Sequence, residues 1–254
     1  MGKIIAITNQ KGGVGKTTTS MNLAAGTALA GKKTLLIDLD PQGNATTGLG
    51  VAKKAGDKNV YGLLVGNADF DSAVRKGVRK NLDVLPSGLE LAGAEIEMVA
   101  MEGRASLLKK ALAGERHLYD FIFIDCPPSL GLLTIDALTA ADSILIPIQS
   151  EFFALEGLTQ LMGTVNAVRK NFNPSLSIEG VILTMYDARR NLSLQVAKEV
   201  KKYFAQTLYK TVITRNVRLS EAPSYGKSIY EYDKYSKGAE CYKNLTEEFL
   251  RRNG

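Results

Sequence analysis

The sequence has little cysteine and histidine and no long apolar run. Its two cysteines, Cys126 and Cys241, lie far apart among 254 residues, which excludes a disulfide-stapled scaffold and is typical of a reducing cytosol. No apolar stretch approaches the roughly 18 residues that a membrane-spanning helix needs. Met1 to Ile5 lead straight into a strand-like segment, so we expect no signal peptide. These absences predict a cytoplasmic globular protein.

The composition is ordinary for a folded domain. Hydrophobic residues make up 45% of the chain and charged residues 23%, which excludes a disordered or collagen-like chain. A chain of 254 residues can bury a core without disulfides or metals. There are 32 Lys and Arg residues and 26 Asp and Glu residues, a formal net charge of +6. This excess is compatible with a nucleic-acid partner, an anionic membrane or neither.

Short apolar runs alternate with longer helix-like stretches. The predicted strands cover residues 4–8, 34–39, 82–85, 121–125, 143–148, 178–184 and 210–213, and the predicted helices cover residues 17–30, 91–113, 131–140, 155–170, 193–205 and 236–252. The strands are nearly continuous apolar runs, as expected when both faces are buried. The pattern predicts an α/β fold with a mostly parallel twisted sheet and helices on both faces. We expect a single domain over residues 1–254.

A glycine-rich loop follows the first predicted strand. Residues 9–18 read NQKGGVGKTT and lead directly into a helix. Glycines let backbone N–H groups turn toward a phosphate, and the helix N-terminus adds a positive dipole. Lys16 stands where a lysine reaches the β- and γ-phosphates, and Thr17 where a hydroxyl binds Mg²⁺. A ligand-free turn is the alternative, which the register of strand, loop and helix disfavours.

Three aspartates follow buried strands. Asp38 and Asp40 end the second predicted strand, where ligands bind in parallel sheets, and their spacing puts them on one face. Capping of the strand end is the alternative role for both. Asp125 follows the run FIFI in the Walker B arrangement, which would hold Mg²⁺ through water. Cys126 is expected to be a small buried residue, because the single histidine, His117, is not its neighbour and is expected at the surface.

The loop departs from the general P-loop pattern, which would place glycine at Gln10. The string KGGVGKTT instead resembles the deviant Walker A motif of the ParA/MinD/nitrogenase-iron-protein class of ATPases. The resemblance implies ATP and Mg²⁺ as cofactors and an ATP-dependent homodimer in which Lys11 reaches the partner's nucleotide. It also implies that Asp40 positions the attacking water and that Asp38 assists, by holding Lys11 or the waters of the magnesium ion.

These implications give a set of predicted site residues. The predicted nucleotide-binding residues are Lys11, Gly12, Gly13, Val14, Gly15, Lys16, Thr17, Thr18 and Asn216. The predicted catalytic residues are Lys11, Lys16 and Asp40, and the predicted magnesium-binding residues are Thr17, Asp125 and Asp38. Thr214 stands where members of the class usually have proline before Arg-Asn, in the loop near the adenine.

Further segments narrow the resemblance. Residues 38–50, 91–97, 124–142, 154–161 and 216–227 look like the chromosomal ParA/Soj group of DNA-partitioning ATPases. The resemblance implies that an ATP-bound sandwich dimer binds double-stranded DNA non-specifically on the nucleoid, and that a ParB-type centromere-binding protein stimulates hydrolysis and release. A link to a replication initiator is a further implication. Large plasmid relatives place a helix-turn-helix domain before the P-loop; here the loop begins at residue 9, so we expect no operator binding.

The basic residues are concentrated in residues 189–227. This segment has nine basic and two acidic residues, a net charge of +7, so the rest of the chain sums to about −1. Such a cluster is typical of phosphate-backbone binding, although a solvated helix face is the alternative. The resemblance adds that Arg189 and Arg218 match positions used for non-specific DNA binding. The predicted DNA-binding residues are Arg189, Arg190, Lys198, Lys201, Lys202, Arg218 and Lys227.

A MinD-like membrane-surface positioning ATPase is the competing hypothesis. Relatives of that kind end in an amphipathic helix that lies on the membrane. Here the apolar positions of residues 236–252 follow helical spacing, which we interpret as packing on the sheet, so no membrane partner is predicted. The nitrogenase-type alternative needs a cysteine pattern for an Fe–S cluster that Cys126 and Cys241 do not match.

Overall fold

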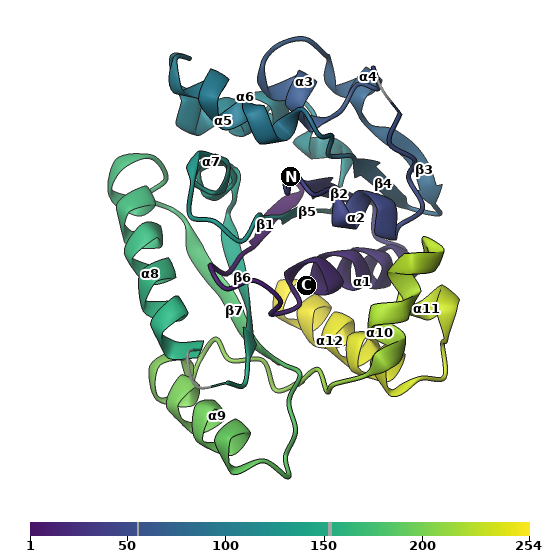
Figure 1. Ribbon diagram of the computed structural model, residues 1–254, viewed down its shortest axis with the longest axis vertical. Helices are drawn as coiled ribbons and strands as arrows, with labels where there is room; N and C mark the ends of the chain where they lie inside the picture. The colour runs from purple at the N-terminus through teal and green to yellow at the C-terminus, as the bar shows by residue number, and fades with distance from the viewer. Residues whose placement is uncertain (55, 152–153) are drawn as a thin grey trace.

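A computed structural model describes residues 1–54, 56–151 and 154–254. The described strands form one seven-stranded sheet in the order β3-β4-β2-β5-β1-β6-β7, with all neighbours parallel except β3 and β4 (Figure 1). The strands are β1 (Lys3–Ile7), β2 (Thr34–Asp38), β3 (Arg75–Arg79), β4 (Leu82–Leu85), β5 (Phe121–Asp125), β6 (Ser143–Gln149) and β7 (Ser177–Thr184). The predicted α/β fold with a mostly parallel sheet is confirmed.

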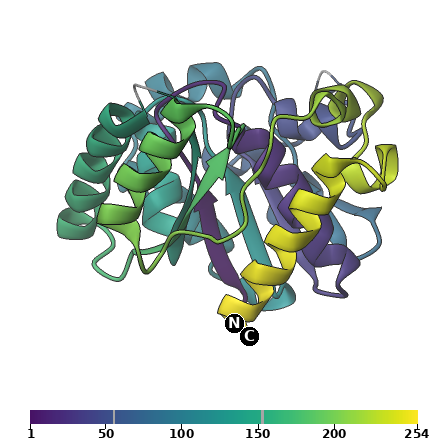
Figure 2. The same ribbon diagram turned by 90° about the horizontal axis from the view of Figure 1, so that it is seen from below.

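Helices cover both faces of the sheet (Figures 1 and 2). They are α1 (Lys16–Leu29), α2 (Asn44–Gly48), α3 (Val60–Leu64), α4 (Phe70–Ala73), α5 (Leu91–Val99), α6 (Leu107–Leu112), α7 (Leu132–Ala140), α8 (Ala154–Asn171), α9 (Asn191–Phe204), α10 (Val217–Glu221), α11 (Ile229–Tyr232) and α12 (Lys237–Asn253). Side chains alternate between two cores: Ile5 and Ile7 pack with α1 and α12, whereas Ile4 and Ala6 pack with α7 and α8.

The C-terminal helix packs on the sheet, as predicted. Phe249 of α12 is fully buried and lies 5.0 Å from the ring of Phe121 and 5.5 Å from that of Phe123. Its apolar stripe is therefore occupied by the protein's own core. Among the described residues, none of the helices has the length and apolar character that a membrane crossing requires.

Two sequence predictions were wrong. Residues 91–113 do not form one helix, because α5 ends at Val99 and a turn through Gly103, with a φ of 69°, precedes α6. Residues 210–213 do not form a strand. They run beside β7, with isolated bridges at Leu208 and Thr214 and a bond from the Ile213 amide to the Leu183 carbonyl. The described residues form no continuous ladder there, because the amides of Lys210 and Thr211 donate to the Glu248 carboxylate of α12 instead.

Residues 75–79 form an edge strand, β3, that was not predicted. β3 reads RKGVR and pairs antiparallel with β4 through an irregular register. Its residues are half-buried or exposed, so it lacks the apolar run that identified the other strands. An exposed, charged strand is suited to the edge of a sheet, where it blunts pairing with other chains.

Candidate functional site

The glycine-rich loop joins β1 to α1 at the carboxyl edge of the sheet. Gly13 and Gly15 have φ angles of 73° and 86°, a region that glycine enters without steric cost. Gly15 is the N-cap of α1 and offers no side-chain cap. The first N–H groups of α1 are thus left for an anion at the helix N-terminus.

Two side chains that the sequence did not single out hold this loop. Asn9 donates to the carbonyl of Pro147 at 2.7 Å and accepts from the Lys11 amide at 3.0 Å. Thr184, at the end of β7, donates to the carbonyl of Val14 at 2.8 Å. Asn9 could have been suspected from its place at the start of the loop, but Thr184 is 170 residues away from Val14 and gave no signal.

Lys16 lies inside the loop. The residue is only 6% exposed, and its Nζ donates to the Lys11 carbonyl at 3.1 Å. Burial lowers the pKa of Lys16, and the nearby Asp125 carboxylate is the largest opposing influence. The charges around Lys16 do not offset the cost of burying its ammonium. A bound phosphate would supply the missing negative charge, so the residue is suited to binding one.

Asp125 fits the predicted magnesium-binding role. It is fully buried, and Ser20 of α1 donates to its Oδ1 at 2.8 Å. Burial, followed by the charge of Asp38, raises the pKa of Asp125, while hydrogen bonds from Thr17 and Ser20 oppose that rise. Oδ2 has no hydrogen-bond partner among the described residues. A water of a magnesium ion held by the Thr17 hydroxyl would satisfy this atom, so the donor set fits Mg²⁺.

Buried atoms without partners gather at this edge of the sheet. In the described part of the chain, such side-chain atoms belong to Thr8, Gln10, Asp125 and Ser150. These residues lie at or just beyond the carboxyl ends of β1, β5 and β6. Unpaired buried polar groups are costly in a protein interior, which indicates that a polar ligand belongs here.

Asp38 and Asp40 lie next to each other but differ in surroundings. Asp38 is fully buried and accepts from the Thr46 amide and hydroxyl at 2.7 and 2.6 Å. Burial raises the pKa of Asp38, and the Thr46 bonds oppose it. Asp40 is 8% exposed and accepts from the Gln42 amide at 2.9 Å. Asp38 therefore anchors α2 through Thr46, and Asp40 has the freer carboxylate of the two.

Lys11 does not contact Asp38 within the chain. Its Nζ lies 2.9 Å from the carboxylate of Glu151, and both side chains are partly exposed. Cys126 is buried and His117 is exposed, as predicted. Burial also raises the pKa of the Cys126 thiol, which keeps it protonated and a poor nucleophile.

A cavity of about 310 Å³ opens beside the loop. Gly15 and Thr18 form its floor at α1, and residues 213–217 form one wall. Asn216 lines this wall, but its Oδ1 accepts from the Arg218 amide at 2.9 Å and caps α10. The side-chain amide nitrogen of Asn216 is thus the group left to face a ligand.

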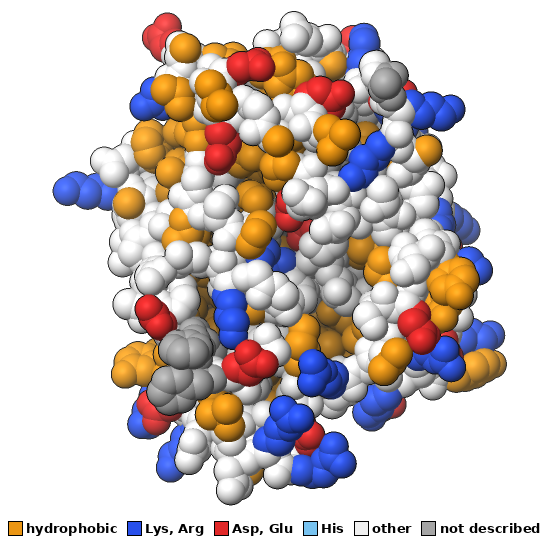
Figure 3. All heavy atoms as spheres, viewed as in Figure 1, with side chains coloured by type: hydrophobic (Ala, Val, Ile, Leu, Met, Phe, Trp, Pro, Cys, Tyr) orange, Lys and Arg blue, Asp and Glu red, His pale blue; other side chains and the backbone are white. Residues whose placement is uncertain are grey.

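The predicted DNA-binding residues are all exposed, and Lys and Arg side chains gather along the lower edge of the face in Figure 3, over α9. Several form ion pairs with acids, and two of these acids, Asp187 and Asp233, lie outside the segment whose charge was counted. Asp187 lies 3.0 Å from Arg189 and 3.7 Å from Arg190, and Arg218 lies between Glu221 and Asp233. Of the seven predicted DNA-binding residues, Lys198, Lys201 and Lys227 form no ion pair with any described residue.

Comparison with known proteins is consistent with this geometry. Residues 2–178 match a family model described as an AAA domain. The chain is 60% identical to the sporulation initiation inhibitor protein Soj of Bacillus subtilis, over 98% of both chains. It is 50% identical to the chromosome-partitioning ATPase Soj of Treponema pallidum, over 100% of this chain and 99% of the relative.

Solved structures share the fold. Cobyrinic acid a,c-diamide synthase from Mycobacterium smegmatis, with bound ADP and magnesium, has a TM-score of 0.87 and 34% identity, over 99% of this chain and 95% of that one. A putative plasmid partition protein from Borrelia burgdorferi, bound to AMPPNP, has a TM-score of 0.82 and 28% identity, over 99% of this chain and 100% of that one.

Proposed function

This chain belongs to the Soj/ParA family of chromosome-partitioning ATPases and uses ATP and Mg²⁺, and from this premise we propose that it is a nucleotide-gated DNA-binding switch. ATP-bound chains form a sandwich dimer, the dimer binds double-stranded DNA without sequence specificity, and hydrolysis releases it. The basic surface over α9 is the observation that carries the DNA-binding part of the proposal.

Each residue of the phosphate loop has a proposed task. Lys16 and the first amides of α1 bind the β- and γ-phosphates, and Thr17 and Asp125 hold the magnesium ion, which supplies charge neutralisation on the phosphates. Asp40 orients the attacking water. Lys11 of the partner chain stabilises the charge that develops during transfer, so hydrolysis requires a dimer.

The cavity beside the loop is proposed as the site of the adenine base. It adjoins Gly15 and Thr18, so a nucleotide whose phosphates lie on the loop can place its base there. Asn216 then contributes its side-chain amide, and the lining also includes the apolar side chains of Met185, Ile213, Val217 and Leu219, which suit a flat heterocycle.

DNA binding is proposed to use charge alone. The Arg189 side chain is 90% exposed, and its ion pair with Asp187 lies at the surface, where such pairs are weak. A DNA phosphate can therefore compete with Asp187 for the guanidinium. The pKa of Asp187 is lowered to about 2 by hydrogen bonds from Arg189, so the acid stays charged at neutral pH. Binding should therefore be weak, salt-dependent and spread over several residues.

The family resemblance supports two protein partners and a location. We propose that a ParB-type centromere-binding protein stimulates hydrolysis, that a replication initiator is a second partner, and that the protein is cytoplasmic and associated with the nucleoid. A MinD-like membrane function is disfavoured, because the apolar stripe of α12 is buried against β5 and so has no free face for a lipid surface.

Co-sedimentation tests the switch. The protein is spun with double-stranded DNA or with anionic vesicles, in ADP or ATP, at several salt concentrations. We expect ATP-dependent sedimentation with DNA that weakens with salt, and loss of it in Lys16→Ala but not in Lys109→Ala, an exposed lysine of α6. Sedimentation with vesicles instead of DNA, or DNA binding that ignores nucleotide, would contradict the proposal.

A further inference from the structure

The segment that forms one wall of the base cavity takes an irregular path beside β7. Val181 donates to the Thr207 carbonyl at 3.1 Å and accepts from the Tyr209 amide at 2.9 Å, which is the start of a parallel ladder. A regular ladder would continue with the Thr211 amide donating to the carbonyl of Leu183. The donor to Leu183 is instead Ile213, at 2.8 Å, two residues later in the chain.

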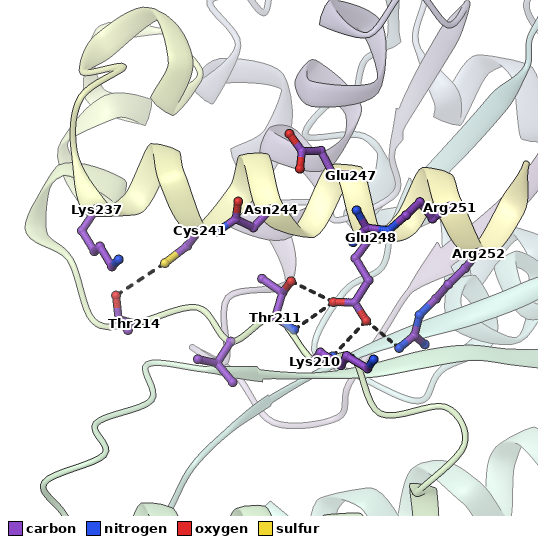
Figure 4. Close-up of a pocket in the computed structure, with 11 residues that line it drawn as sticks. Lys210, Thr211, Thr214, Lys237, Cys241, Asn244, Glu247, Glu248, Arg251 and Arg252 are labelled. Carbon is purple, nitrogen blue, oxygen red and sulfur yellow. Dashed lines mark hydrogen bonds and ion pairs between the residues drawn. The ribbon is translucent and has the colours of Figure 1, made fainter.

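A single carboxylate binds the part of the chain that leaves the ladder. Glu248 of α12 accepts from the Lys210 amide at 2.9 Å through Oε1, and from the Thr211 amide and hydroxyl at 2.8 Å each through Oε2. Figure 4 shows this carboxylate pointing from α12 into the groove between the helix and the extended segment. The Thr211 amide, which a regular strand would turn toward β7, is thus satisfied by a helix side chain together with the amide of Lys210 before it.

Arg252 completes the attachment. It donates to Glu248 Oε1 at 2.7 Å and to the Leu208 carbonyl at 2.9 Å, and its guanidinium lies 3.8 Å from the centre of the Tyr209 ring. Glu248 is only 7% exposed, so its charge needs these partners. Burial opposes ionisation of Glu248, but the hydrogen bonds from Lys210, Thr211 and Arg252 hold its pKa below the usual range.

The displacement determines which residues reach the base cavity. Ile213 and Thr214 line that cavity, and Thr214 also contacts Cys241 of α12, with 3.7 Å between Oγ1 and Sγ. If the ladder relaxed to its regular register, residues 213–216 would move along β7 by two positions, roughly 7 Å. Asn216 would then leave its place beside the phosphate loop.

From this geometry we propose that Glu248, more than 200 residues from the phosphate loop in sequence, is a positioning residue for nucleotide binding. It holds residues 210–212 out of the ladder and so places the wall that contacts the base. The inference rests on the proposed base cavity. It predicts an effect on recognition of the base, with the phosphate chemistry of Lys16 and Asp40 left intact.

The test compares Glu248→Gln with Glu247→Gln, the adjacent exposed residue of the same helix, which undergoes the same change of charge. ATP and GTP titrations give binding constants and hydrolysis gives KM and kcat, with thermal unfolding as the folding control. For Glu248→Gln we expect the KM for ATP to rise at least fivefold, the preference for ATP over GTP to narrow, and kcat at saturation to stay within about twofold of the parent.

Two outcomes overturn the inference. One is a folded Glu248→Gln protein whose ATP affinity and ATP/GTP ratio equal those of Glu247→Gln; the other is a loss confined to kcat. If Glu248→Gln does not fold, Thr211→Val is the variant to test, because it removes only the hydroxyl donor to Glu248. It should raise the KM for ATP by a smaller factor. Asn216→Ala separates this result from failure of the cavity assignment, because a correctly assigned cavity makes that variant lose ATP affinity whatever Glu248 does.

Discussion

The Lys11 ammonium lies 2.9 Å from the Glu151 carboxylate of its own chain. In the proposed dimer the same lysine reaches the partner's nucleotide, so the intrachain pair competes with dimer formation. Its side chains are 32% and 51% exposed, which places the pair among surface ion pairs worth about 1 kcal/mol or less.

Removing that competitor should favour the dimer. We expect Glu151→Gln to lower the protein concentration needed for ATP-dependent dimerisation by up to about 30-fold, because a dimer breaks two such pairs, and sedimentation at several concentrations measures it. Glu156→Gln, which removes a nearby exposed charge at the start of α8, should leave dimerisation unchanged. A weaker dimer in Glu151→Gln would mean that this carboxylate supports the interface instead of competing with it.

Asp40 should separate hydrolysis from binding. Asp40→Asn keeps the size of the side chain but removes the carboxylate proposed to orient water, so we expect kcat to fall by about 10²–10⁴ with ATP affinity within a few-fold of the parent. Phosphate release and ATP titration measure the two quantities. Asp71→Asn, an exposed acid of α4, is the control, and hydrolysis within threefold of the parent would refute the assigned role.

Charge reversal should separate DNA binding from ATP binding. We expect Arg189→Glu and Arg218→Glu each to weaken DNA affinity at least tenfold, and to reduce the dependence of log affinity on log salt by about one for each DNA phosphate that the variant no longer binds. ATP affinity should not change. Lys109→Glu makes the same change of charge on α6; equal losses in all three variants would point to net charge and not to a defined surface.

Asp136 should make stability depend on pH. This α7 carboxylate is fully buried and accepts from the Leu108 amide at 3.1 Å, and burial raises its pKa to about 7. Between the unfolded value near 4 and about 7 the folded chain therefore binds the additional proton. The free energy of unfolding contributed by Asp136 falls as pH rises through this window, by at most about 4 kcal/mol.

Urea unfolding between pH 4 and 8 measures this slope. Asp136→Asn should flatten it, whereas Asp71→Asn should not. Asp38 and Asp125 also have raised pKa values and give a slope of the same sign, so the difference between the variant and the parent isolates Asp136. Identical slopes for the parent and Asp136→Asn would show that Asp136 is ionised in the fold.

The sequence predicted those parts of the fold that local patterns determine. The strand at residues 121–125 was predicted at its observed bounds because an unbroken apolar run is sufficient to identify a buried central strand. β3 was missed because its edge position lets it be charged and half-exposed. Residues 210–213 include Thr-Val-Ile and have strand propensity. The amides of Lys210 and Thr211 nevertheless donate to Glu248, which lies well beyond them in the chain.

The site shows the same division. The sequence could place Lys16, Thr17 and Asp125 near one another, because strand ends and a glycine pattern identify them along the chain. It could not place Ser20 and Thr184 there, because their roles depend on which strand lies beside which. Asp187 changes the charge of the basic surface although it lies just outside the segment with the highest count.

The position of β1 has a consequence for synthesis of the protein. Lys3 pairs with Phe121 on one side and Ile5 with Ser143 on the other, so β1 has neither of its neighbours in the sheet until β5 and β6 have been synthesised. Translation of the intervening chain takes on the order of ten seconds. Throughout that time the nascent chain has no assembled phosphate loop and cannot bind a nucleotide. Its apolar strand β1 is exposed to chaperones and to other nascent chains.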